Sequence, residues 1–189
     1  MKISGLTKSY EKHVVLNELT LNLEKGHIYA VMGNSGCGKT TLLHILLGIL
    51  EPDSGSIEKA GEKNFSAVFQ ENRLFDFLTA AENVAVVQKK LQKSEAIDQT
   101  LAEILPAASL KQRVEEFSGG MKRRVAIGRA MLTESNVIVM DEPLTGLDEG
   151  TRDQVINFIL KYRRGRTLIF STHQEKEVEL FREEKIVLE

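Results

Sequence analysis

The sequence has little of several features that mark particular classes of protein. One cysteine among 189 residues excludes a disulfide framework and is consistent with a reducing compartment. No stretch approaches the ~20 consecutive apolar residues that span a bilayer. The N-terminal residues lack the long apolar core of a signal peptide, and the chain has no internal repeat or low-complexity linker. We therefore expect a soluble, cytoplasmic protein.

The sequence also lacks a strong excess of charge of one sign. The net charge is −2, so no global attraction to nucleic acid or acidic lipid is expected, and we predict no nucleic-acid partner. A hydrophobic fraction of 42% is ample for a buried core. The length predicts one large domain, or a domain that contains an inserted subdomain.

The most informative stretch is GNSGCGKT, residues 33–40, which matches the phosphate-loop pattern G-x-x-x-x-G-K-[ST]. A strand-like run precedes it at 27–32, and a run with helical character follows at 41–47. Backbone N–H groups at such a helix start bind phosphate, and glycines let the backbone approach closely. A glycine-rich turn without a ligand is the alternative. We expect a nucleoside triphosphate to bind at Gly33, Asn34, Ser35, Gly36, Cys37, Gly38, Lys39, Thr40 and Thr41, with Lys39 at the β- and γ-phosphates and Thr40 at Mg²⁺.

Strands and helices alternate along most of the chain. The first third is β-rich, and residues 71–116 contain no glycine and are predicted to form helices interrupted by Pro106. After residue 120 we predict a helix at 121–132, a buried strand at 137–140, an amphipathic helix, a strand at 167–170, a helix from Gln174 and a last strand at 185–188. This alternation predicts an α/β fold with a parallel sheet. We divide the chain into a β-rich part at 1–70, a helical subdomain at 71–117 and the remaining α/β core at 118–189.

Two acids, Asp141 and Glu142, follow the predicted strand at 137–140. Ligands of open α/β sheets bind at the carboxyl ends of strands, and successive side chains there point to opposite faces. Asp141 fits a magnesium ligand, and Glu142 fits a general base or a residue that orients water. The alternative is a solvated strand end that carries two acids.

A second candidate phosphate site lies at Ser118-Gly119-Gly120. Ser118 is a natural helix N-cap, and the two glycines expose the N–H groups of the first turn. Lys122, Arg123 and Arg124 follow, although the helix dipole disfavours cations at this end. A negative ligand would relieve this conflict; a capped helix with a solvated basic face is the alternative. One nucleotide does not need two such sites on one chain, which suggests that two subunits grip each ATP.

Together these motifs resemble the ATP-binding subunits of ABC transporters over nearly the whole chain. Residues 117–121 (FSGGM) resemble the signature, 137–142 the Walker B strand, 146–148 (GLD) the D-loop, Gln70 the Q-loop glutamine, His173 the H-loop histidine and Tyr10 the aromatic that stacks on adenine. Met121 stands where many members have glutamine, and Phe117 replaces the usual leucine.

The resemblance implies a P-loop NTPase core with a mostly parallel sheet, an N-terminal antiparallel β subdomain and an inserted helical subdomain. It implies an ATPase that uses ATP and Mg²⁺, with Glu142, His173 and Gln70 catalytic and with Thr40, Gln70 and Asp141 at the metal. Two copies, or a pair of cassettes, would bind ATP head to tail, and Tyr10, Ser118, Gly119, Gly120 and Asp148 would contact nucleotide. His173 has a second interpretation, as the first residue of a helix capped through Thr172-x-x-Glu175.

The implied partner is a transmembrane permease at the inner face of the cell membrane. The apolar segment 73–78 (RLFDFL) is our candidate for its docking groove, with packing inside the helical subdomain as the alternative. The segment 69–75 and Met121 are similar to importers of the nitrate, sulfonate and taurine type, with cassettes for lipoprotein release and peptide export as alternatives. Rival functions are a soluble ABC-type ATPase in a nucleic-acid or ribosome-associated process and a kinase or GTPase built on the same loop.

Overall fold

A computed structural model describes residues 1–11, 13–59, 64–88, 93–181 and 184–188. These residues form two compact units, which we describe one at a time. The first unit contains residues 1–65, 136–141 and 165–189, and the second contains residues 66–135 and 142–164. No helix among the described residues is long and apolar enough to cross a membrane.

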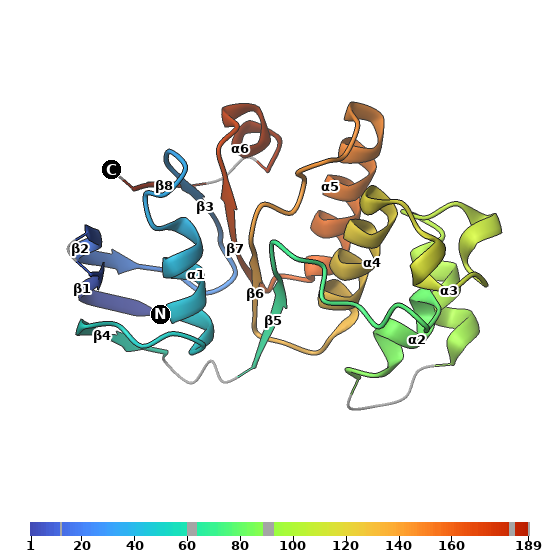
Figure 1. Cartoon of the computed structure of the whole chain (residues 1–189), viewed down its shortest axis with the longest axis horizontal. Helices are drawn as coiled ribbons and strands as arrows, with labels where there is room; N and C mark the ends of the chain where they lie inside the picture. Colours follow the sequence, from blue (N-terminus) through green and yellow to red (C-terminus); the bar gives the residue numbers. More distant parts are fainter. Residues whose placement is uncertain (12, 60–63, 89–92, 182–183, 189) are drawn as a thin grey trace. The chain divides into compact units, whose positions relative to one another are not determined.

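The first unit contains an antiparallel sheet built from the start of the chain (Figure 1). Its strands lie in the order β2-β1-β4 and span Lys2–Tyr10 (β1), His13–Asn22 (β2) and Ser54–Glu58 (β4). Both neighbours of β1 pair with it antiparallel. This sheet confirms the antiparallel β subdomain. Strand β4 begins at Ser54, because residues 54–58 pair with β1.

The same unit contains a parallel sheet, in which β6, β7, β3 and β8 are neighbours in that order. The strands span Ile28–Met32 (β3), Val137–Met140 (β6), Thr167–Thr172 (β7) and Glu184–Val187 (β8). All three pairings between them are parallel. Every residue of β3, β6 and β7 is buried, which explains the apolar runs at 28–32, 137–140 and 168–170.

Helix α1 (Lys39–Leu47) joins the two sheets of this unit into one core (Figure 1). Alternation along each strand sends every second side chain toward this helix. On the other side of the parallel sheet, Phe170 packs against Phe181 of helix α6 (Glu175–Phe181), with ring centroids 4.6 Å apart. The shared core contains Ile3, Leu6, Leu16, Tyr29, Val31, Leu42, Leu43, Leu46, Val137, Val139, Ile169 and Ile186.

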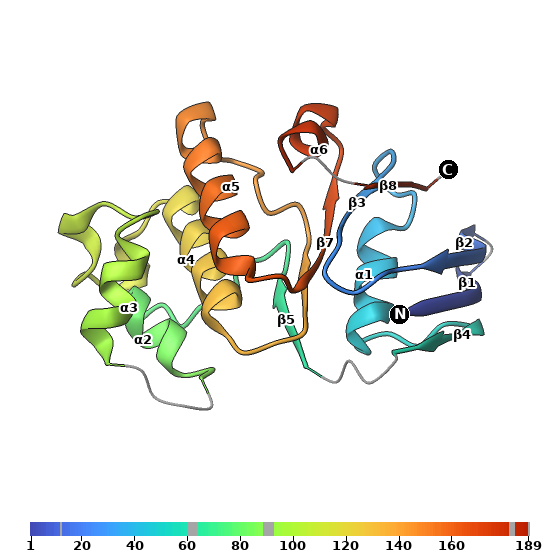
Figure 2. The same ribbon diagram turned by 180° about the vertical axis from the view of Figure 1, so that it is seen from behind.

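The second unit is mainly helical (Figure 2). Its helices are α2 (Ala80–Ala85), α3 (Ser94–Leu101), α4 (Gly119–Leu132) and α5 (Glu149–Arg163), with 3-10 turns at Ala107–Ser109 and Val114–Glu116. Strand β5 (Phe65–Val68) leads into it. The expected subdomain at 71–117 forms part of this unit, although residues 89–92 lie outside the described chain. The unit also includes α4 and α5, because α4 packs against both α2 and α5.

Candidate nucleotide-binding site

The glycine-rich loop lies between β3 and α1, where the sequence placed it. Gly38 is the N-cap of α1, with a left-handed φ of 101°. A Cβ atom on Gly38 would lie 2.6 Å from the backbone oxygen of Val15, so the loop packs directly on β2. Asn34, Ser35 and Gly36 remain exposed on the open side of the loop. A bulkier residue at position 38 would therefore break both the turn and its packing.

Lys39 is the first residue of α1, and its side chain folds back onto the loop. The residue is 7% exposed, and its ammonium donates to the backbone oxygens of Gly33 at 2.7 Å and Asn34 at 2.9 Å. Both bonds hold the positive charge against the phosphate loop itself. A cation in this position is suited to an incoming phosphate.

Asp141 lies at the end of β6, and hydroxyl groups from two other elements donate to it. The Thr40 hydroxyl donates to Asp141 Oδ2 at 2.7 Å, and the Ser171 hydroxyl at the end of β7 donates to Oδ1 at 2.5 Å. Asp141 is 4% exposed and Ser171 is fully buried. Thr40 and Asp141, predicted to share a metal, are therefore in direct contact. Ser171 was not predicted as a site residue. Its place at the carboxyl end of the neighbouring predicted strand is the signal in the sequence that could have indicated it.

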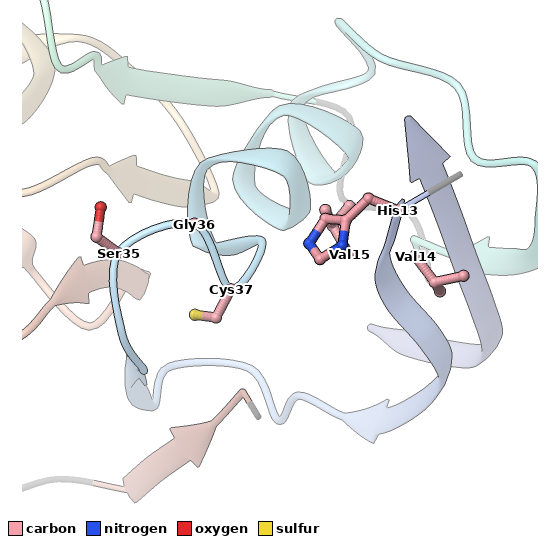
Figure 3. A pocket seen from close by; sticks show the side chains of 6 residues that line it. All are labelled: His13, Val14, Val15, Ser35, Gly36 and Cys37. Atoms are coloured by element: carbon pink, nitrogen blue, oxygen red, sulfur yellow. The ribbon is translucent and has the colours of Figure 1, made fainter. Parts of the chain in front are cut away.

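A pocket of about 320 Å³ opens beside the phosphate loop (Figure 3). The start of β2 and the loop line it, through His13, Val14, Val15, Ser35, Gly36 and Cys37. Tyr10, at the end of β1, pairs with His13 across the β1–β2 turn and is 48% exposed. The Lys8 ammonium lies 5.9 Å from the centre of the Tyr10 ring. The pocket is large enough to hold a small ligand next to the loop.

His173 follows β7 in the first unit and is exposed. The local structure differs from the capping box that was the second interpretation of this segment. Thr172 remains in β7, where its hydroxyl accepts the Gln174 N–H at 3.0 Å and donates to the buried Glu177 at 2.5 Å. The helix begins only at Glu175, so the Thr172 hydroxyl ties α6 to the end of β7.

The second unit holds the remaining site residues. Ser118 is the N-cap of α4, and its hydroxyl accepts the Met121 N–H at 3.2 Å. Ser118 and Gly119 are exposed, and a Cβ atom on Gly119 would meet nothing within 4 Å. A Cβ atom on Gly120 would lie 3.6 Å from the Gly146 oxygen, in ordinary contact. The segments called signature and D-loop above are therefore neighbours within this unit.

Asp148 is the N-cap of α5 and accepts the Thr151 N–H at 3.0 Å. That backbone bond is the main reason that the pKa of Asp148 is lowered, and the charge of Arg124 contributes. Because its pKa is lowered, the ionised Asp148 stabilises the fold above its ordinary pKa of about 4. This contribution is lost as the pH falls through the lowered pKa.

Glu142 is the first residue of the second unit after β6, and its backbone is unusual. Its φ is 45°, although Pro143 follows and disfavours such a conformation. The Thr145 hydroxyl donates to its Oε2 at 3.3 Å. Strained residues of this kind cluster at functional sites. No pattern in the sequence predicts this conformation.

Gln70 follows β5, and its side chain is exposed. Its backbone oxygen accepts a bond of 2.6 Å from Arg123 of α4. Arg123 is 8% exposed, so it does not form the solvated basic face that was the alternative interpretation of this helix. The cations after the signature also have partners within the unit: Lys122 pairs with Asp76, and Arg124 donates to the Ile104 oxygen. A negative ligand is not needed to explain them.

A glycine-rich loop between a buried parallel strand and a helix, with Thr40 bound to the strand-end Asp141, defines a P-loop nucleoside-triphosphate-binding protein. Comparison with known families is more specific. Residues 16–145 match the sequence profile of the ABC transporter family, so the chain belongs to that family and is an ATPase cassette. This confirms the predicted family, and the rival assignments as a kinase or GTPase fall away.

Solved structures of similar cassettes share the fold over the whole chain. One is a dimeric post-hydrolysis state of the ATP-binding cassette MJ0796 bound to ADP and Pi, 24% identical, covering 100% of this chain and 94% of that one, with a TM-score of 0.80. A dimeric structure of MJ0796, described as a bacterial ABC transporter cassette, is 25% identical, with coverage of 99% and 93% and a TM-score of 0.82. An ABC transporter ATP-binding protein from Pyrococcus furiosus is 24% identical, with coverage of 99% and 96% and a TM-score of 0.86.

Proposed function

We propose that this chain is the ATP-hydrolysing subunit that drives solute transport through a separate transmembrane protein. ATP is bound by the phosphate loop of one copy and by Ser118, Gly119 and Gly120 of a second copy. Glu142 activates the attacking water, with Gln70 and His173 at the γ-phosphate. Two cassettes close on ATP and open after hydrolysis, and the membrane partner follows this cycle.

The observation that carries the proposal is the exposed start of α4. Ser118 caps the helix, and Gly119 leaves open space where any other residue would place a Cβ atom. Neither internal packing nor a positive φ requires glycine at position 119. An external group that approaches the backbone closely explains it, and phosphate is the ligand that helix starts bind. In support, the related cassette MJ0796 is dimeric and has been seen with ADP and Pi.

Thr40 in the first turn of α1 and Asp141 after β6 fit a magnesium ion. Thr40 Oγ1 and Asp141 Oδ2 are 2.7 Å apart, close to the spacing of about 3 Å expected for adjacent oxygens in an octahedral magnesium shell. Both are hard oxygen ligands, which Mg²⁺ prefers. When bound, the ion neutralises charge on the β- and γ-phosphates. Thr40 and Asp141 would hold it, and the Gln70 amide is the proposed third contact.

The test is Glu142→Gln, which keeps the shape of the side chain and removes the base. We expect kcat for ATP to fall at least about 100-fold, because a general base contributes that much or more. ATP binding should persist, and a stable dimer should accumulate with Mg-ATP in size-exclusion chromatography with light scattering. Glu115→Gln, an exposed change in the same unit, is the control and should leave turnover unaltered. Normal turnover by Glu142→Gln would refute the assignment of the base.

The proposed membrane contact is the apolar segment 73–78. Phe75 and Phe77 are 43% and 65% exposed, and their rings meet edge to face with centroids 6.2 Å apart. The proposed occupant is a short amphipathic helix of the permease, laid against this aromatic pair.

Phe75→Ser with Phe77→Ser should abolish recovery of the chain with membranes and leave ATP affinity unchanged. Leu160→Ser, at a residue 38% exposed on α5, is the matched control and should remain on the membranes. Loss of both recruitment and ATP binding would instead assign the two aromatic residues to the core. Sedimentation of the wild-type chain with ribosomes rather than membranes would favour the soluble ATPase.

A further inference from the structure

Two arginines of α4 hold the segment that carries Gln70. Arg123 donates from Nη1 to the Phe69 oxygen and from Nη2 to the Gln70 oxygen, both at 2.6 Å. Arg129 donates to the Arg73 oxygen at 2.8 Å and to the Asn72 oxygen at 3.3 Å. We call Arg123 and Arg129 the carbonyl clamp. All of these residues belong to the second unit.

The clamped segment is unfavourable by itself. Arg73 has a left-handed φ of 45°, which is uncommon outside glycine. The Asn72 side-chain oxygen is buried and has no hydrogen-bond partner within the described residues. An unmade buried hydrogen bond and a left-handed residue both cost free energy. Residues 69–73 therefore depend on the clamp to keep this conformation.

The clamp is built to fix backbone position. Arg123 is 8% exposed, whereas Arg129 is partly buried, and burial lowers the pKa of the Arg129 guanidinium. A guanidinium offers a rigid fork that can bond two oxygens at once, which the single ammonium of lysine does less well. These four bonds all go to backbone oxygens. The clamp therefore holds the main chain around Gln70, whatever the neighbouring side chains are.

The rest of the loop has a different anchor. Asn83 of α2 is fully buried, and it bonds the backbone N–H and oxygen of Phe75 and the oxygen of Thr79. Residues 75–79 are therefore attached to α2, whereas residues 69–73 are attached to α4. Ser118 is also the N-cap of α4, about one and a half turns before Arg123. Within this unit, α4 therefore carries both the exposed N-terminus proposed to bind phosphate and the carbonyl clamp that holds the backbone of Gln70.

We propose that Arg123 and Arg129 are positioning residues, which make the placement of Gln70 follow the placement of the Ser118 helix start. A ligand that binds at Ser118 and fixes the position of α4 also fixes the position of the backbone of residues 69–73. ATP hydrolysis then reaches its full rate only when such a ligand holds α4 in position. This inference rests on the role proposed for Gln70.

The test compares four variants of the full chain: Gln70→Ala, Arg123→Gln, the two combined, and Arg123→Lys. Arg123→Gln should lower kcat at least about tenfold with KM for ATP within about threefold, because nucleotide binding is retained and only the hydrolytic arrangement is lost. Arg123→Lys keeps the charge but loses the two-pronged guanidinium, so its kcat should lie between those of the wild type and Arg123→Gln. Arg113→Gln, which removes an exposed arginine of the same unit, is the control. Arg129→Gln should reproduce Arg123→Gln.

Two readouts separate positioning from a general loss of structure. In the Gln70→Ala background, Arg123→Gln should lower kcat no further, within about twofold, because both changes remove one function. Hydrogen exchange of amides 69–73 should rise at least about tenfold in Arg123→Gln, with exchange in the interior of α4 unchanged.

The proposal would be overturned if the losses of kcat from the two substitutions multiply in the double variant. Unchanged hydrogen exchange at amides 69–73 in Arg123→Gln would overturn it as well. If Gln70→Ala alone leaves kcat unchanged, the proposed role of Gln70 is wrong. The exchange measurement still decides in that case whether the clamp positions this segment.

Discussion

Asp141 illustrates how much one carboxylate can depend on its hydroxyl neighbours. Thr40 donates to one of its oxygens and Ser171 to the other, and these donors come from α1 and β7. Hydrogen bonds to a charged acceptor are stronger than neutral ones, so each donor restricts the carboxylate. The phosphate-loop pattern, together with the place of Asp141 after the buried strand at 137–140, was enough to pair Thr40 with Asp141. Ser171 could not, because only the packing of β6 beside β7 brings it there.

Ser171→Ala should weaken both stability and metal use. The variant leaves a buried carboxylate oxygen without its donor, so the free energy of unfolding should fall by about 1.5–3 kcal/mol in urea titrations. The Mg²⁺ concentration needed for half-maximal ATPase activity should rise, because Asp141 is less well held.

Ser66→Ala provides the comparison. The Ser66 hydroxyl pairs with the Ser135 hydroxyl at 3.0 Å, a bond between neutral groups. Its loss should cost only about 1 kcal/mol and should not change the Mg²⁺ requirement. Equal effects of the two substitutions would show that the charge of Asp141 is unimportant.

At the scale of the element, α4 contains glycines with opposite meanings. A Cβ atom on Gly119 would meet nothing within 4 Å, whereas a Cβ atom on Gly128 would lie 2.5 Å from Leu101 Cδ2 of α3. Gly128 is therefore required by helix packing, and Gly119 is not. The sequence singled out Gly119 as part of the Ser118-Gly119-Gly120 motif. It did not predict the role of Gly128, because that role depends on contact with α3, a distant segment of the chain.

Gly119→Ala should separate folding from function. Alanine is the better helix former, so stability should stay equal or rise by up to about 1 kcal/mol. ATPase activity should nevertheless fall at least about tenfold, because the added methyl stands where phosphate approaches the backbone. Gly128→Ala should instead lower the free energy of unfolding by about 1–3 kcal/mol through overpacking. Unchanged activity in Gly119→Ala would remove the main support for the second phosphate site.

At the scale of the whole molecule, the proposed ATP site needs two chains. Lys39→Ala removes the loop cation, and Gly119→Ala blocks the helix start; each variant should be nearly inactive alone. A mixed dimer retains one intact site, made from the loop of the Gly119→Ala copy and the helix start of the Lys39→Ala copy. An equal mixture should therefore recover about a quarter of wild-type activity if random two-fold dimers form.

The measurement is the ATPase rate of the mixture against the sum of the separate rates. Dilution offers a second readout, because specific activity should fall once the dimer dissociates. No recovery on mixing, with each variant still dimeric, would place both halves of the ATP site on one chain.

The sequence by itself determined the features that depend on neighbours along the chain. The phosphate loop between strand and helix, the acids after β6 and the N-cap at Ser118 were all predicted, because turn geometry, strand alternation and helix capping are local. Only the tertiary structure decided where the cations of α4 find partners. Arg123, for which a negative ligand was one interpretation of the sequence, is buried against Phe69 and Gln70, more than fifty positions away. Such contacts arise from packing between distant segments, which no local pattern encodes.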